Sequence, residues 1–225
     1  GTTTWTYAWT PAAQGAVTIK SRAFDDTGNL EPAGTGEGSP NVVTVTVTAP
    51  AAPTCPCTVF QPTDAPGGQF NDGQAINVGM KFRTTIGGFI TGARFYKGAA
   101  NTGTHTGLLW SGTGTLLASA VFTGETASGW QEVTFTSPVA VTAGTTYIVA
   151  YHSSGGGYAA NDTYFTSAVV NGPLRALASG EDGPNGMYIY AAALTFPTQN
   201  FMTSNYWADV VFNTAVGPDE TPPTI

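Results

Sequence analysis

Apolar and polar residues alternate along most of the chain, and a period of two predicts β-strands, whose side chains point to opposite faces in turn. No helical pattern of apolar residues lasts three turns. After residue 57, turn residues separate the alternating segments at short intervals. These segments are 75–84, 88–98, 107–112, 116–123, 130–137, 145–153 and 206–213. The pattern predicts an all-β fold, an antiparallel β-sandwich of jelly-roll type, over residues 57–213.

Residues 1–48 show the same alternation in "WTYAWTP", "GAVTIKSRAFD" and "NVVTVTVTA", with the turn "DDTGN" between them. This stretch resembles the C-terminal part of bacterial immunoglobulin-like domains. A complete sandwich of that type needs about 100 residues, so we expect this domain to be truncated or completed by strands outside the sequence. We expect residues 49–56 to form a Pro/Ala linker, and residues 214–225 to form a second linker into a following domain.

The composition narrows the classes of partner. Only 9% of the residues are charged, whereas about 25% is usual in soluble domains. The formal net charge is −7, which argues against a nucleic-acid partner, because binding to phosphates requires a basic patch. No apolar run approaches the roughly 20 residues of a membrane-spanning helix. Such a weakly charged surface, rich in hydroxyl and amide groups, suits a secreted or cell-surface protein.

The two cysteines, Cys55 and Cys57, are separated only by Pro56. A disulfide between them would close a very small ring, and the proline could hold the turn that this ring needs. Two free thiols are the alternative. The spacing does not favour a metal site, because no second pair of cysteines or histidines follows.

One long segment carries a family resemblance. It runs from Val78 to His152 and reads "VGMKFRTTIGGFITGARFYKGAANTGTHTGLLWSGTGTLLASAVFTGETASGWQEVTFTSPVAVTAGTTYIVAYH", with "YWADVVF" following at 206–212. These motifs resemble the secreted bacterial domain-of-unknown-function family numbered four thousand and eighty-two, over residues 57–213. The resemblance implies an extracellular domain that lies among immunoglobulin-like repeats. It implies no established activity, so function has to be argued from the residues.

The stretch 94–110, "RFYKGAANTGTHTGLLW", combines basic, aromatic and polar residues. At strand period Phe95 faces the core, so we expect Arg94 and Tyr96 to face outward or to line a cleft. Asn101 and His105, in the loop, allow two interpretations. Either they bond within the loop and to neighbouring backbone groups, or they form a polar rim for sugar hydroxyls.

A second group of polar and aromatic residues follows the strand that ends at His152. The glycines of "SSGGGY" permit a close approach of the backbone to a ligand, and Tyr158 and Tyr164 lie on either side of Asn161 and Asp162. Tyrosines in sandwiches are also half-buried for structural reasons alone. As a binding site, the rings would pack on sugars while the polar side chains form hydrogen bonds. The candidate ligand-binding residues are Tyr96, Asn101, His105, His152, Tyr158, Asn161 and Tyr164.

Three tryptophans lie in or beside strands among alternating apolar residues, which favours packing in the core or at a seam over a ligand platform. They are Trp110, Trp130 and Trp207. Asp209 shares a strand face with the last of them. A carboxylate on such a face needs a partner, and Arg94 or Lys97 is a candidate.

Catalytic motifs are missing from the sequence. No nucleophile-elbow pattern occurs, neither histidine stands in a known catalytic motif, and no spacing pairs two carboxylates as a glycosidase requires. We therefore expect no enzymatic activity. Calcium is the one cofactor that the sequence allows, because the acidic turns 25–29, 71–74 and 181–186 offer oxygen ligands. Ordinary turn chemistry explains these turns without calcium.

The leading hypothesis is a non-catalytic module of a large secreted or cell-surface multidomain protein, flanked by immunoglobulin-like domains, that binds a polysaccharide or glycan. The alternative is a structural spacer or self-assembling repeat, in which a head-to-tail contact builds an open filament. The residues proposed for that contact are Val42, Val43, Val45 and Val47. Convergence of the candidate side chains on one concave surface would favour binding, and scatter would favour the spacer.

Overall fold

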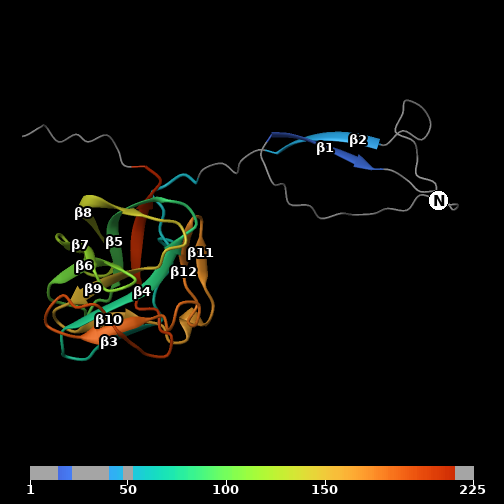
Figure 1. Cartoon of the computed structure of the whole chain (residues 1–225). Helices are drawn as coiled ribbons and strands as arrows, with labels where there is room; N and C mark the ends of the chain where they lie inside the picture. The colour runs from blue at the N-terminus through green and yellow to red at the C-terminus, as the bar shows by residue number, and fades with distance from the viewer. Residues whose placement is uncertain (1–14, 22–40, 48–52, 216–225) are drawn as a thin grey trace, which may run out of the picture. The chain divides into compact units, whose positions relative to one another are not determined.

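The computed structural model describes residues 15–21, 41–47 and 53–215. The chain divides into two compact units, Gly1–Ala52 and Pro53–Ile225. The second unit is called the module below, and each unit is described by itself (Figure 1).

In the first unit, β1 (Gly15–Ser21) pairs antiparallel with β2 (Asn41–Val47). Val17 lies opposite Val45 in this register. Two of the predicted N-terminal strands are thus present in part. The predicted strand "WTYAWTP" and the turn at 25–29 lie outside the described residues.

The first sheet of the module is built around four long strands. They are β4 (Ile76–Thr84), β6 (His105–Ser111), β7 (Leu116–Val121) and β9 (Tyr147–Ser153). Four short strands extend this sheet: β11 (Val169–Asn171), β12 (Leu174–Ala176), β13 (Met187–Tyr190) and β14 (Gln199–Asn200). The order is β11-β12-β4-β9-β6-β7, and β13 pairs with both β4 and β14.

The second sheet has the order β15-β5-β8, with β5 (Gly88–Lys97) between β15 (Ala208–Asn213) and β8 (Gly129–Val141). A further antiparallel pair joins β3 (Gly68–Asn71) to β10 (Gly157–Ala160). The described part of the module contains one short 3-10 helix, η1 (Tyr164–Thr166). Among the described residues, no helix is long and apolar enough to cross a membrane.

One hydrophobic core lies between the two sheets. Tyr151 on β9 stacks on Phe95 of β5 in this core, with ring centroids 4.5 Å apart. Phe82 on β4 belongs to the same core, and all three residues are at most 1% exposed. Full burial of one such side chain stabilises the fold by about 1.5–3 kcal/mol. Alternate residues of the first sheet, among them Leu108 and Ile148, face a second, smaller cluster. Two antiparallel sheets around a shared core are consistent with a β-sandwich.

Arg94 does not face outward as the sequence suggested. It is 7% exposed, and its guanidinium lies 2.6 Å from the carboxylate of Asp209, directly opposite in the register of β5 and β15. The same carboxylate accepts backbone N–H groups from Val59 at 2.8 Å and Phe60 at 3.2 Å. The expected partner of Asp209 is therefore Arg94. Burial raises the pKa of the Asp209 carboxyl, whereas Arg94 and the backbone donors oppose this shift.

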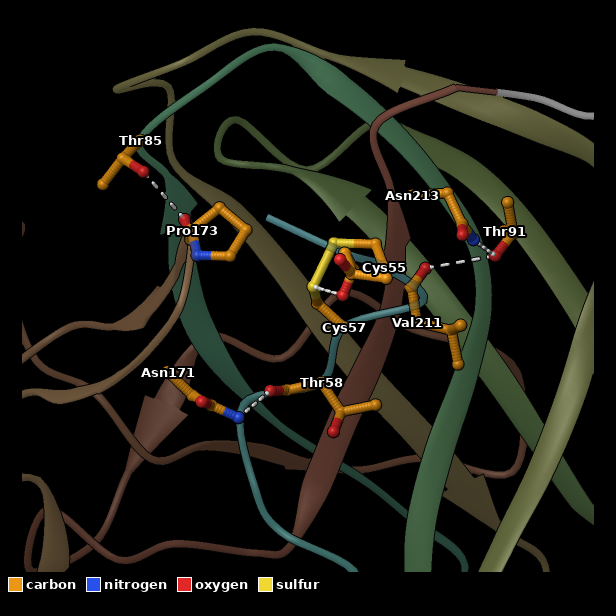
Figure 2. The surroundings of a disulfide bond; sticks show 10 residues. Cys55, Cys57, Thr58, Thr85, Thr91, Asn171, Pro173, Val211 and Asn213 are labelled. Carbon is orange, nitrogen blue, oxygen red and sulfur yellow. Dashed lines mark hydrogen bonds between the residues drawn. A yellow bond between two sulfur atoms is a disulfide. The ribbon is translucent and has the colours of Figure 1, made fainter. Parts of the chain in front are cut away.

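The chain enters and leaves the module side by side. Cys57 and Phe212 exchange two backbone hydrogen bonds of 2.8 Å each. Cys55 and Cys57 form a disulfide, so the free-thiol alternative does not hold (Figure 2). On the exit strand, the Asn213 side chain donates to Thr91 at 2.9 Å. In Figure 1 these ends lie at the top of the module, and β3 and β10 lie at the bottom.

Candidate functional site

Three adjoining hollows meet at Tyr158 on β10. Their cavity volumes are about 130, 260 and 140 Å³, and Tyr158 lines all three. Phe70, directly opposite Tyr158 on β3, lines the first and the third, while Phe201 and Tyr206 line the second and the third. We call this region the Tyr158 surface. Its six aromatic side chains are Phe70, Tyr158, Tyr188, Tyr190, Phe201 and Tyr206.

Neighbouring rings order part of this set, and three of its members are open to solvent, whereas Tyr206 is only 5% exposed. Phe70 stacks on Tyr158 with ring centroids 5.7 Å apart, and Tyr206 meets Tyr158 edge to face at the same distance. Phe70 is 48% exposed, Tyr190 is 42% exposed and Phe201 is 53% exposed. Contiguous exposed apolar surface of this kind commonly marks a binding site.

Asp72 fixes two of the rings. The Tyr158 hydroxyl donates to Asp72 Oδ2 at 2.9 Å, and the Tyr190 hydroxyl donates to the same oxygen. Burial and the bond to Asp72 raise the pKa of Tyr158. The bond to Asp72, together with burial, raises the pKa of Tyr190 to about 12. Both phenols therefore stay protonated at neutral pH, with their hydroxyls turned to Asp72.

The loop that carries Phe201 holds an unusual backbone. Met202 has a φ of 46° and Thr203 a φ of 50°, a left-handed conformation that residues other than glycine adopt infrequently. Backbone N–H groups of Thr163 and Phe165 bond to the carbonyls of these two residues, at 2.8 and 2.9 Å. The neighbouring segment thus holds a strained loop that displays Phe201, and such strain is typical of ligand-contacting segments.

The comparison with protein families identifies the chain. A family model described as "Domain of unknown function (DUF4082)" matches residues 63–208. The chain belongs to this family. The match confirms the resemblance drawn from the sequence, and all six rings of the Tyr158 surface lie within the matched residues. No curated protein matches the chain.

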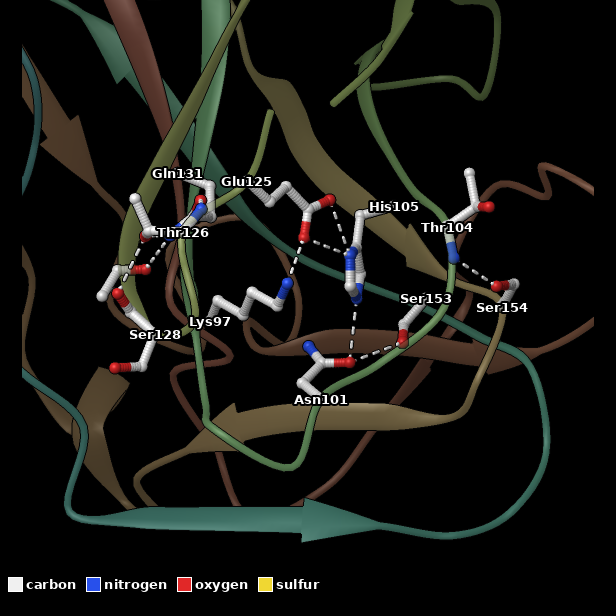
Figure 3. Close-up of polar contacts among 11 residues, drawn as sticks. Lys97, Asn101, Thr104, His105, Glu125, Thr126, Ser128, Gln131, Ser153 and Ser154 are labelled. Atoms are coloured by element: carbon white, nitrogen blue, oxygen red, sulfur yellow. Dashed lines mark hydrogen bonds and ion pairs between the residues drawn. The ribbon is translucent and has the colours of Figure 1, made fainter. Parts of the chain in front are cut away.

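The seven candidate residues do not converge on one surface. Tyr158 and Asn101 line the Tyr158 surface. His105, in contrast, is fully buried. Its Nδ1 lies 2.8 Å from the Glu125 carboxylate and its Nε2 lies 2.8 Å from Asn101 Oδ1, while Lys97 donates to Glu125 at 2.7 Å (Figure 3). Burial lowers the pKa of His105, although Glu125 opposes this. His105 therefore bonds to side chains inside the fold, where a glycan cannot reach it.

Two more candidates are tied into the fold. Asn101 is 3% exposed, and its Oδ1 also accepts the Ser153 hydroxyl at 3.1 Å. His152 is 7% exposed on β9, where it pairs with Asn77 on one side and Thr106 on the other. Burial lowers the pKa of His152. His152 therefore lies within the sheet, its role toward a ligand stays a prediction, and Asn101 contributes only to the wall of one hollow.

The remaining three candidates gather around Trp207. Its indole N–H donates to Asn161 Oδ1 at 2.8 Å. Tyr96 and Tyr164 meet the Trp207 ring edge to face, at 6.3 and 5.8 Å, and Trp130 lies 6.0 Å away. Trp207 is 2% exposed, so these side chains extend the core. The structural expectation for the tryptophans is confirmed, and Tyr96 does not share a surface with Tyr158.

Most of the aromatic residues of the Tyr158 surface are absent from the candidates that the sequence indicates. Tyr188 and Tyr190 occupy alternate positions of "MYIY", a signal that was available but too short to stand out. Phe70 precedes an Asn-Asp-Gly turn that was considered only for calcium, and Phe201 lies in an irregular segment.

The acidic turns have partners other than a metal. Asp72 in turn 71–74 accepts two phenols, and Glu181 and Asp182 in turn 181–186 pair with Arg175 and Arg83. Within the described ranges, no group of three or more His, Cys, Asp or Glu side chains is placed to hold a metal ion. Turn 25–29 lies outside those ranges.

Proposed function

We propose that the module binds a polysaccharide on the Tyr158 surface. The observation that carries the proposal is the contiguous set of six rings around three hollows. Sugar C–H faces pack on aromatic rings, and the amides of Gln69 and Asn71 at the first hollow can bond sugar hydroxyls.

We place this module, as a non-catalytic part, in a secreted or cell-surface multidomain protein. The Cys55–Cys57 disulfide supports an oxidising compartment, because disulfides persist mainly outside the cytosol. We also propose a jelly-roll connection of the strands and an immunoglobulin-like origin for the β1–β2 pair. Membership in the DUF4082 family and the all-β fold agree with these assignments.

The spacer hypothesis is the alternative. A spacer needs no exposed aromatic surface, and the three most exposed rings would then cost solubility without serving a purpose. If these rings instead join two copies of the chain, the protein will be a dimer or filament in solution, and replacement of Phe201 will make it monomeric. Size-exclusion chromatography of the wild-type chain and of Phe201→Ala distinguishes self-association from glycan binding.

Replacement of Phe201 or Tyr158 by Ala should weaken glycan binding by about 1–3 kcal/mol, the usual cost of removing a contact anchor. The glycan is first identified on an array that covers plant, fungal, bacterial and animal polysaccharides, and affinity is then measured by calorimetry. The chain length of the bound glycan should stay unchanged on incubation, as expected for a non-catalytic module.

Tyr96→Ala is the matched control. Tyr96 packs on Trp130 and Trp207, so its loss should lower the melting temperature and leave glycan affinity nearly unchanged. The proposal fails if no glycan on the array binds, or if Tyr96→Ala weakens binding as much as Phe201→Ala does.

A further inference from the structure

Two carboxylates flank the Tyr158 surface. Asp162 lines the third hollow, and Asp72 accepts the phenols of Tyr158 and Tyr190. Both carboxylates are exposed. Each uses one oxygen in the described part of the chain: Oδ2 of Asp72 for the phenols, and Oδ1 of Asp162 for the Ser204 hydroxyl at 2.8 Å. The other oxygen of each carboxylate is available to a ligand.

The basic side chains of the described module are engaged elsewhere. Four of them form the ion pairs Arg83–Asp182, Arg94–Asp209, Lys97–Glu125 and Arg175–Glu181. Lys81 donates to the carbonyl of Asp182. No lysine or arginine of residues 53–215 therefore forms an ion pair with Asp72 or Asp162, and the Tyr158 surface carries uncompensated negative charge.

Carboxylates already accept three hydroxyl donors of this surface, those of Tyr158, Tyr190 and Ser204. Beside the amides of Gln69 and Asn71, the surface offers ring faces and the acceptor oxygens of two carboxylates. An ammonium group brings three N–H donors and a positive charge, and both carboxylates and ring faces attract it. An acidic sugar brings further acceptors and negative charge, which this surface repels.

We infer that the polysaccharide bound here carries protonated amino groups, as a polymer of glucosamine does. Its pyranose faces pack on the rings, and its ammonium groups bond to Asp72 and Asp162. This inference rests on the proposed function and names the class of glycan. It separates amino-sugar polymers with free amines from the same polymers in N-acetylated form, and from acidic polysaccharides.

The test compares two ligands that differ only at the nitrogen. Calorimetry on the 225-residue chain uses β-1,4-linked glucosamine oligomers and N-acetylglucosamine oligomers of the same length. At pH 5 the amines of the glucosamine oligomer are protonated, although the ring oxygens make them less basic than a lysine amine, and a carboxyl group of ordinary pKa is ionised. The glucosamine oligomer should bind at least about tenfold more tightly, as expected for one charge-assisted hydrogen bond. Added salt should reduce the difference.

Asp72→Asn and Asp162→Asn should each reduce affinity for the glucosamine oligomer about tenfold, and leave affinity for the N-acetylated oligomer unchanged. Asparagine at 72 keeps an oxygen that can accept the phenols. Glu132→Gln is the control, because it removes an exposed carboxylate from β8, which belongs to the second sheet of the module. This variant should bind both oligomers as the wild type does.

The outcomes separate the two proposals. Equal binding of both oligomers, tighter binding of the N-acetylated one, or binding only of a neutral or acidic glycan overturns the inference and leaves the proposed function standing. Failure of every glycan to bind overturns both. If Asp72→Asn does not fold, Asp162→Asn and the salt dependence of the wild type decide the question.

Discussion

Replacement of Arg94 by Met should lower the free energy of unfolding by about 3–5 kcal/mol at pH 7, the cost of leaving one partner of a buried ion pair alone. Asp209 is 0% exposed, so no water compensates for the lost guanidinium. The aliphatic stem of Met fills part of the space over the Trp130 ring, where the guanidinium carbon lies 4.5 Å from the ring centre. Urea unfolding followed by circular dichroism measures the change.

Arg175→Met is the matched control for this prediction. The Arg175–Glu181 pair is 38% and 30% exposed, and an exposed pair contributes only about 0–1 kcal/mol. Similar losses of unfolding free energy in both variants would contradict the prediction, because burial would then add nothing to the contribution of the Arg94–Asp209 pair.

The loss caused by Arg94→Met should depend on pH. Burial raises the pKa of Asp209, and in the variant no guanidinium opposes that shift. A protonated carboxyl costs less to bury than a carboxylate. The destabilisation should therefore be smallest below the unfolded-state pKa of about 3.9 and should grow as the pH rises through the folded-state pKa.

Trp207→Ala should destabilise the module by about 3–5 kcal/mol, the usual cost of truncating a buried tryptophan. The ring contacts Phe60, with centroids 5.2 Å apart, and its N–H is bonded to Asn161. Trp207 also has a φ of 55°, in the left-handed region where a side chain with a Cβ is strained by about 1–2 kcal/mol.

The left-handed backbone conformation at Trp207 leads to a second prediction. Glycine within a strand is usually about 0.5–1 kcal/mol less stable than alanine, but at position 207 glycine relieves the left-handed strain. Trp207→Gly should therefore be at least as stable as Trp207→Ala in urea unfolding. The usual order, with alanine clearly better, would show that the conformation relaxes once the ring is gone.

The long strands were predictable, because burial of one or both faces imposes a readable pattern on seven or more residues. β4, β5 and β9 fall within their expected ranges for this reason. The short strands β3 and β10 were missed, since four residues show too little of a period. Their pairing brings together residues nearly ninety positions apart, which no local pattern records.

The interpretation of Arg94 failed for a related reason. Strand period correctly placed Phe95 in the core and Arg94 on the opposite face of β5. The segment that contains Val59 and Phe60 covers that face, and this contact between distant parts of the chain cannot be inferred from spacing. Tyr158 was found because tyrosine near glycine and asparagine is a local signal. The rings that surround it come from three other segments and meet only in the folded chain.

The hydrogen bonds between Cys57 and Phe212 join the segment that enters the module to the strand that leaves it. The two ends of the module are therefore adjacent. Adjacent ends are the geometry that lets a domain be inserted into a loop of a host protein or circularly permuted. β3 and β10 lie at the other end of the module (Figure 1). The Tyr158 surface can therefore be carried by unrelated hosts, with both junctions at the opposite end of the module.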